Sequence, residues 1–169
     1  MELLFGIQDI TVTSTTSSKT VVRQGCNVSI NITVENQGYY SETFNLTAYA
    51  NTTIITTLTN ITLTSGNSTN ITFTWNTTGV PYGYYTITAN ATSVPGESET
   101  ADNTFENGWV VVTGVGDVNG DLVVNVLDVI LALVNAGSVP PKPPECDVNC
   151  DNTINVLDLI LCLVNAGPV

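Results

Sequence analysis

The chain has 169 residues, 43% of them hydrophobic, which is enough for one medium domain or two small ones with packed cores. It carries 15 acidic residues against 3 basic ones and no histidine, so its formal net charge is −12. Nucleic acids and anionic bilayers are bound by basic surfaces, so we expect neither as a partner. The lack of histidine removes the commonest general base, and we expect no enzymatic activity.

The N-terminal ten residues are too short and too acidic for a signal peptide or a membrane span. Residues 3–7 (LLFGI) are nevertheless apolar and can add as a strand to the sheet edge of a neighbouring copy. No later segment is long and apolar enough to cross a bilayer, so we expect no membrane insertion.

Residues 1–113 contain runs in which apolar and polar side chains alternate, as at 28–34, 44–49 and 71–75. Such alternation is typical of strands with one buried side and one solvent-facing side. Turn residues separate about seven such strands, which predicts an antiparallel, immunoglobulin-like β-sandwich. We expect Trp75 and Trp109 in its core; the alternative is a sugar-stacking platform.

Short motifs mark this region: Asn36-Gln37-Gly38, Ser65-Gly66 ahead of Trp75, the run 83–87 at the start of the next strand, and Glu97 ahead of Asp102-Asn103. On these residues, the segment from about 5 to 113 resembles the CARDB domain, an immunoglobulin-like or fibronectin-like adhesion module. The resemblance implies a sandwich fold and an extracellular setting, but no particular ligand.

Nine of the twelve asparagines before residue 114 begin an Asn-x-Ser/Thr sequon, and none after it does. We expect N-linked glycans on the solvent faces of the strands, and hence a secreted or cell-surface protein. The alternative is a surface rich in Thr and Asn that carries no sugar. The candidate sites are Asn27, Asn31, Asn45, Asn51, Asn60, Asn67, Asn70, Asn76 and Asn90.

Residues 114–169 contain an internal repeat with a period of 30 residues. The segment 116–121 recurs as 146–151, and 125–137 recurs as 155–167 with only two substitutions. A duplicated unit predicts paired elements that pack on each other. We therefore expect a second domain at 114–169, small and α-helical, after the sandwich at 1–113.

Each repeat places side-chain oxygens at positions 1, 3, 5, 9 and 12 of a loop. This spacing surrounds a hard cation such as Ca²⁺, with the position-7 carbonyl completing the shell, so we expect two calcium sites. The alternative is that these residues form only solvated turns and helix N-caps. The predicted ligands are Asp117, Asn119, Asp121, Val123, Asn125 and Asp128 in the first loop, and Asp147, Asn149, Asp151, Thr153, Asn155 and Asp158 in the second.

Two such loops, each followed by a single helix, resemble the type I dockerin over about residues 116–167. The resemblance implies paired F-hands that bind a cohesin-like domain of another chain through positions 10 and 11 of each loop. The predicted partner surface is therefore Val126, Leu127, Val156 and Leu157; alternatively, these residues complete the local core. Position 6 is usually a glycine with positive φ, but here it holds leucine in the first loop, which is disfavoured.

Four cysteines, Cys26, Cys146, Cys150 and Cys162, fit an oxidising compartment. Cys146 or Cys150 can pair with Cys162, which leaves Cys26 for a cross-domain or intermolecular bond, but the sequence does not choose among the pairings. The alternative is a zinc site made by Cys146, Cys150 and Cys162, without a histidine to support it. Residues 140–144 (PPKPP) predict a stiff connector between the repeats.

Together these patterns predict an all-β immunoglobulin-like sandwich plus a small α-helical dockerin-like domain. The favoured function is a non-catalytic extracellular calcium-binding assembly or adhesion protein that docks to a partner through its apolar helices. The alternative is a glycosylated filament or surface-layer subunit that polymerises with copies of itself. An enzyme or carbohydrate-binding fragment comes third, because Glu97 and Glu99 are the nearest paired carboxylates outside the loops and no nucleophile stands beside a base.

Overall fold

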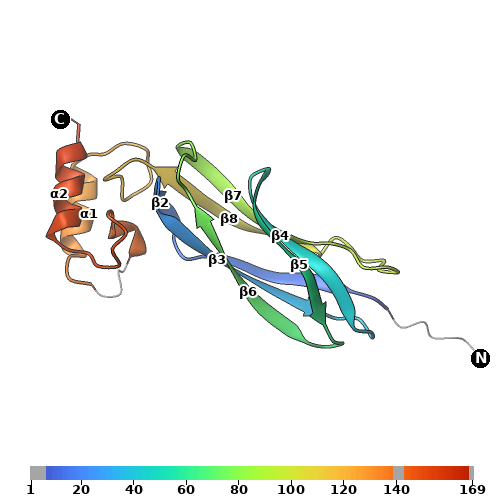
Figure 1. The fold of residues 1–169 in the computed structure, drawn as a ribbon. Helices are drawn as coiled ribbons and strands as arrows, with labels where there is room; N and C mark the ends of the chain where they lie inside the picture. Colours follow the sequence, from blue (N-terminus) through green and yellow to red (C-terminus); the bar gives the residue numbers. More distant parts are fainter. Residues whose placement is uncertain (1–6, 139–142, 168–169) are drawn as a thin grey trace, which may run out of the picture. The chain divides into compact units, whose positions relative to one another are not determined.

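A computed structural model describes residues 7–138 and 143–167, whose fold is drawn in Figure 1. Most of the apolar segment 3–7 and part of the connector 140–144 lie outside the described residues. The described elements are β1 (Ile10–Ser17), β2 (Val21–Arg23), β3 (Asn27–Asn36), β4 (Glu42–Ala50), β5 (Thr53–Leu63), β6 (Ser68–Asn76), β7 (Gly83–Ala91), β8 (Thr104–Thr113), α1 (Val126–Val134), the 3-10 helix η1 (Pro144–Cys146) and α2 (Val156–Asn165).

The strands form two sheets, ordered β1-β3-β6 and β2-β8-β7-β4-β5. β4 pairs antiparallel with both β5 and β7, whereas β2 runs parallel to β8. The predicted β-sandwich is confirmed, with eight strands instead of about seven in the described residues. β2 has only three residues, too few to show an alternating pattern. The number of strands predicted from the sequence was therefore too low.

Alternation along β3 places every second side chain in the core. Val28, Ile30, Ile32 and Val34 are fully buried, because successive side chains of a strand point to opposite faces. β5 differs, since it lies at the edge of its sheet and only its last residue is buried. This strand therefore presents a largely uncovered edge.

The two tryptophans lie in different environments. Trp75 is buried as predicted, but Trp109 is 63% exposed, so the prediction that it lies in the core is wrong. Gly108 comes before Trp109 with a φ of +39°, a conformation that interrupts the alternation of β8. The ring of Trp109 instead lies edge-on to Tyr84, with ring centroids 5.8 Å apart.

The repeats form a small two-helix region in which α1 and α2 lie side by side (Figure 1). No helix of the described residues is long and apolar enough to span a membrane. The two helices cover a compact cluster of buried side chains drawn from both repeats, namely Val118, Ala132, Cys146, Val148, Ile154 and Cys162. A small helical region after the sandwich is therefore confirmed, and its core is shared by the two copies.

The contacts divide the chain into two compact units. Unit 1 comprises Met1–Thr16, Ile30–Phe73 and Thr86–Gly108. Unit 2 contains both repeats and part of the strands, and comprises Ser17–Ser29, Thr74–Tyr85 and Trp109–Val169. The domain boundary at residue 113 stays a prediction.

Candidate functional site

The predicted calcium ligands lie in two loops of unit 2, the first loop at residues 117–128 and the second loop at residues 147–158. Each loop leads directly into a helix, which begins at Val126 in α1 and at Val156 in α2. Position 12 of each loop is therefore the third residue of its helix, where its side chain reaches back to the loop.

The first loop is closed by hydrogen bonds between backbone amides and its own side chains. Asp117 accepts from the amide of Gly120 through Oδ1 at 2.8 Å and from that of Leu122 through Oδ2 at 2.9 Å. Asn119 and Asp121 each accept from the amide two residues further on, at 3.0 and 2.8 Å. Short polar side chains thus replace the hydrogen bonds that a helix or sheet would give this backbone.

Asp128 fastens the start of the first loop to α1. Its fully buried carboxylate accepts from the amides of Val118 at 2.8 Å, Asn119 at 3.1 Å and Asn125 at 2.9 Å. Asn125 caps α1 by accepting from the amide of Leu127 at 2.8 Å. The two residues form a capping box, a role that needs no metal.

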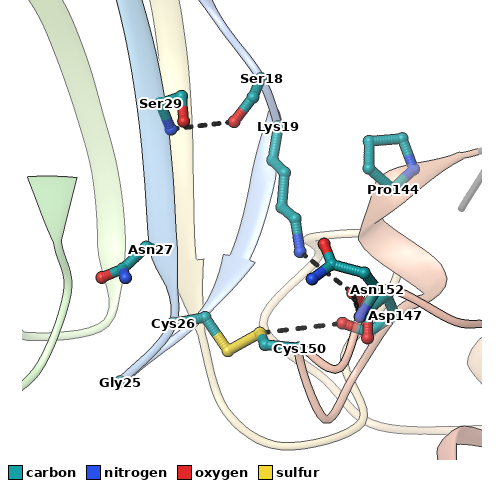
Figure 2. Close-up of a pocket in the computed structure, with 10 residues that line it drawn as sticks. All are labelled: Ser18, Lys19, Gly25, Cys26, Asn27, Ser29, Pro144, Asp147, Cys150 and Asn152. Carbon is teal, nitrogen blue, oxygen red and sulfur yellow. Dashed lines mark hydrogen bonds and ion pairs between the residues drawn. A yellow bond between two sulfur atoms is a disulfide. The ribbon is translucent and has the colours of Figure 1, made fainter. Parts of the chain in front are cut away.

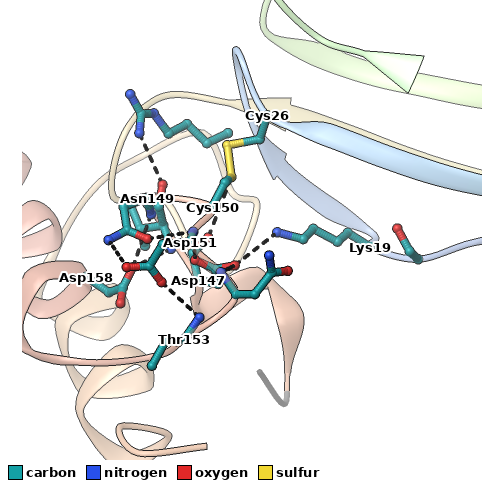
Figure 3. A network of polar contacts seen from close by, with 12 residues as sticks. Lys19, Cys26, Asp147, Asn149, Cys150, Asp151, Thr153 and Asp158 are labelled. Atoms are coloured by element: carbon teal, nitrogen blue, oxygen red, sulfur yellow. Dashed lines mark hydrogen bonds and ion pairs between the residues drawn. A yellow bond between two sulfur atoms is a disulfide. The ribbon is translucent and has the colours of Figure 1, made fainter. Parts of the chain in front are cut away.

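The second loop repeats this arrangement (Figure 3). Asp158 accepts from the amides of Val148, Asn149 and Asn155 at 2.8, 3.1 and 2.9 Å, the same three distances as in the first loop. Asp147 is also buried, at 4% exposure, and accepts from two amides of its loop at 3.0 Å. Similar local sequence has therefore produced similar local geometry, except that Oδ1 of the first aspartate binds the amide of Gly120 in the first loop and that of Asp151 in the second.

The backbone at position 6 adopts the conformation that usually calls for glycine. Leu122 has a φ of +68° and Asn152 a φ of +67°. Position 4 is left-handed as well, with a φ of +76° at Gly120 and +61° at Cys150. Asparagine and glycine tolerate this region but leucine and cysteine do not, so the backbone strain falls at position 6 in the first loop and at position 4 in the second.

The donor set of each loop suits a hard divalent cation, because it consists of three carboxylates and two side-chain amides. Burial raises the pKa of Asp117, and the negative charges of Asp128 and Asp121 add to the rise, against the lowering effect of two backbone amides. Buried negative charge of this kind is unfavourable without a counter-charge. In residues 7–138 and 143–167, however, no three Asp, Glu or Cys side chains converge on one point, so no formed metal centre is seen.

A disulfide joins Cys26 to Cys150 within unit 2 (Figure 2). Of the pairings that the sequence left open, a bond from Cys26 to the C-terminal repeats is formed, whereas neither Cys146 nor Cys150 pairs with Cys162, because position 4 of the second loop faces the segment after β2 and not its own helix. A cavity of about 610 Å³ lies beside the disulfide. Of the described residues that line it, Lys19 and Asp147 are charged.

Two basic side chains hold the second loop. The Nζ atom of Lys19 lies 3.9 Å from Oδ2 of Asp147 (Figure 2), and the guanidinium of Arg23 donates to the carbonyl of Val148 at 3.3 Å. These are the only basic residues outside the connector, since the third is Lys142. Part of the negative charge of the second loop is therefore compensated by the protein itself.

Cys146 and Cys162 are free thiols and fully buried in the helical core. Burial raises the pKa of Cys146 to about 11 and that of Cys162 to about 12. Both thiols therefore stay protonated and unreactive at neutral pH. The zinc alternative loses a ligand, because the sulfur of Cys150 is held in the disulfide.

The predicted partner residues lie on the outside of the helices. Val126, Leu127, Val156 and Leu157 are 58, 55, 63 and 53% exposed, so the alternative that they complete the local core is wrong. The same helix faces continue with further exposed apolar side chains at Ile130, Leu133, Val134, Ile160, Leu163 and Val164. We call these ten residues the apolar helix face.

Comparison with known families identifies the strand-rich part of the chain. Residues 7–107 match the model of the CARDB family. The chain belongs to the CARDB family. The predicted resemblance of residues 5–113 is thus confirmed, whereas the region after residue 107 has no family assignment and its dockerin resemblance stays a prediction.

Two solved structures of a CARDB domain from Pyrococcus furiosus share the fold. The crystal structure, in complex with di-metal ions, is 24% identical, has a TM-score of 0.55, and covers 64% of this chain and 96% of that one. The solution structure is 23% identical with a TM-score of 0.54, and covers 64% of this chain and 97% of that one.

A third structure is a domain of a Methanosarcina acetivorans protein whose name assigns it to the cell surface. It is 30% identical, has a TM-score of 0.50, and covers 63% of this chain and 92% of that one. No curated protein matches the chain. The CARDB part is thus similar to a domain of a protein that is named as a cell surface protein.

The candidate glycosylation sites all lie at the surface of the CARDB part. Six of the nine asparagines are exposed, and Asn31, Asn45 and Asn90 are half-buried. Asn51 and Asn60 have φ values of +54° and +59°, a conformation that asparagine tolerates in tight turns. The six exposed asparagines are therefore placed where a glycan can project into solvent.

Lys19 and Arg23 were not predicted to belong to the site. The small number of basic residues could have indicated this role. In a chain of charge −12 the few basic side chains are attracted to buried acidic ones. Their partners could not be read from the sequence, since Lys19 and Asp147 are far apart along the chain.

Proposed function

We propose that this CARDB protein is a non-catalytic extracellular assembly protein, in which the two C-terminal loops bind Ca²⁺ and the helices dock to a partner chain. The cell-surface relative and the disulfide support the setting, because disulfides persist in oxidising compartments. The sequons support N-linked glycans on the CARDB part only.

The apolar helix face is the observation that carries this proposal. Its ten residues are 46 to 69% exposed and occupy equivalent positions in the two repeats. Soluble proteins seldom leave a continuous apolar surface uncovered unless it serves an interaction. A groove of about 440 Å³ between the start of α1 and the end of α2 adds a recess, lined by Val126, Val129 and Leu163 among others.

Ca²⁺ supports the proposed function because it would neutralise the carboxylates of the two loops. The predicted ligands of each loop supply oxygen donors and three negative charges, which a divalent cation neutralises. The same loops set the first turn of α1 and of α2, because position 12 is the third residue of each helix. Binding of Ca²⁺ would therefore stabilise the helices that carry the apolar helix face.

The proposed partner is a cohesin-like domain of another chain. No sequon follows residue 114, so glycans would shield the CARDB part and leave the helices bare. Hydrophobic residues at Val126, Leu127, Val156 and Leu157 suit a dry contact, and their duplication offers two equivalent orientations of docking.

Calorimetric titration of a cohesin-like domain from the same source into the full chain tests this proposal. We expect binding with Ca²⁺ and none with EDTA. The double variant Leu127→Asp with Leu157→Asp should lose binding at least tenfold, whereas Leu58→Asp, an exposed leucine of β5, should not. Equal affinity of the double variant and the unmodified chain would show that the apolar helix face is not the docking surface.

Self-assembly is the second candidate function, favoured by the uncovered edge of β5. This strand carries exposed Ile54 and Leu58, and an exposed edge can accept a strand of a neighbouring copy. Sedimentation and electron microscopy of the purified chain separate the two functions. A docking protein stays monomeric alone, whereas a filament or surface-layer subunit forms concentration-dependent assemblies.

A further inference from the structure

A second acidic group lies in unit 1, which contains neither of the repeated loops. Burial raises the pKa of Asp9, and the negative charges of Asp102, Glu97 and Glu99 raise it further. Unit 1 has no lysine, arginine or histidine at any position. No side chain of this unit can therefore supply a positive charge to the group.

Glu97 already has a complete set of hydrogen-bond partners. Its Oε1 accepts from the amide of Ile10 at 2.7 Å, and its Oε2 accepts from the amide of Val94 at 2.9 Å and from Nδ2 of Asn103 at 3.1 Å. This carboxylate joins the start of β1 to the segment before β8 and needs no further ligand.

Asp9 and Asp102 are not satisfied in this way. Thr11 Oγ1 donates to Oδ2 of Asp102 at 2.8 Å and is also within hydrogen-bonding reach of Asp9. One hydroxyl hydrogen serves only one of the two carboxylates at a time. The remaining oxygens, Oδ1 of Asp9 and Oδ1 of Asp102, are buried and have no partner among the described residues.

Asn103 adds a third oxygen of the same kind. The residue is 2% exposed, and its Nδ2 donates to Oε2 of Glu97, so the amide lies against a member of the acidic group. Its Oδ1 is buried and has no donor among residues 7–138 and 143–167. A buried acceptor without a donor costs about 1 to 3 kcal/mol, so three of them need a common explanation.

We propose that Asp9, Asp102 and Asn103 provide a cation site in the CARDB part, which takes a hard divalent ion such as Ca²⁺. Two carboxylates and an amide oxygen are ligands that Ca²⁺ prefers, and two negative charges call for a divalent ion. A single proton shared by the two carboxylates would satisfy at most two of the three oxygens. The ion fastens the residue before β1 to the residues before β8, beside the bridge made by Glu97.

Bound Ca²⁺ is measured by equilibrium dialysis and atomic absorption on the full chain, at about 1 mM free Ca²⁺, a concentration that fills extracellular sites. The variants are Asp102→Asn and Asp9→Asn, which keep the size of the side chain. The matched control is Glu106→Gln, an exposed carboxylate of the same unit. Circular dichroism establishes that each variant is folded.

We expect Asp102→Asn and Asp9→Asn each to lower the bound Ca²⁺ by about one ion per chain, and Glu106→Gln to leave it unchanged. Equal binding by the unmodified chain and both Asp variants would overturn this site and leave a shared proton as the explanation. The readout is a difference between variants, so it does not depend on whether the C-terminal loops bind. Failure of those loops would lower the total in every variant alike.

Discussion

The first and second loops have similar sequences and closely similar internal hydrogen bonds, but different neighbours. The second loop is fastened by the disulfide to Cys26 and by the ion pair between Lys19 and Asp147. The first loop contains no cysteine and has no ion pair within the described part of the chain; the hydroxyl of Tyr84 donates to its Gly120 carbonyl at 3.2 Å. Local sequence therefore sets the shape of a loop, whereas its charge balance is decided by distant segments.

This difference has a consequence for metal binding. The carboxylates of the first loop have no basic partner among the described residues, whereas those of the second have Lys19. A cation would therefore relieve more electrostatic repulsion in the first loop. Substitutions at equivalent positions of the two loops can test whether the loops contribute equally to stability.

Substitution of the aspartate at position 12 of either loop should cause the largest loss of stability. Asp128→Ala or Asp158→Ala removes the acceptor of three backbone amides and should lower the free energy of unfolding by about 3 kcal/mol or more. Urea denaturation followed by circular dichroism measures this. Asp121→Ala, at an exposed position, is the control and should have a smaller effect. Equal midpoints for Asp128→Ala and the control would contradict the structural role of position 12.

Removal of the disulfide should cause the next largest loss of stability. The bond holds the second loop and not the first. Cys26→Ser with Cys150→Ser opens a covalent link between residues 124 positions apart, which should cost about 2 to 4 kcal/mol of stability. Thermal melting with and without dithiothreitol measures it. The unmodified chain should lose stability on reduction and the double variant should not; a reductant effect of equal size on both would mean that another bond is involved.

Substitutions at position 6 should change the free energy of unfolding by a smaller amount, and differently in the two loops. Leu122→Gly relieves a positive φ that leucine disfavours and should stabilise the protein by about 0.5 to 1 kcal/mol. Asn152→Gly should change stability by less, because asparagine tolerates this conformation. Urea midpoints of the two variants provide the comparison, and a larger gain at Asn152 would show that backbone strain is not the difference.

The last prediction concerns the chemical reactivity of the free thiols Cys146 and Cys162 and involves no change in stability. Their raised pKa values mean that the thiolate form grows only as pH rises towards about 11 for Cys146 and about 12 for Cys162. Iodoacetamide at neutral pH should therefore label neither residue in the folded chain. After denaturation without reductant, mass spectrometry should find both labelled. Label on Cys26 or Cys150 instead would mean that the pairing is different.

Much of the fold could be predicted because its signals are local. Alternation along β3 and β4 marks buried strand faces, and the spacing of acids in the repeats places Asp128 and Asp158 at the third residue of a helix. The exposure of the helices also follows from composition, since a small domain cannot bury two helices that are apolar on most sides.

The sequence by itself determined the strand pattern, the twin loops and their capping residues, because hydrogen bonds over a few residues depend on few neighbours. Tertiary structure alone decided that Cys26 bonds to Cys150, that Trp109 faces solvent, and that Asp102 lies beside Thr11. Each of these outcomes depends on which distant segments the sheets bring together, and no local pattern encodes that pairing.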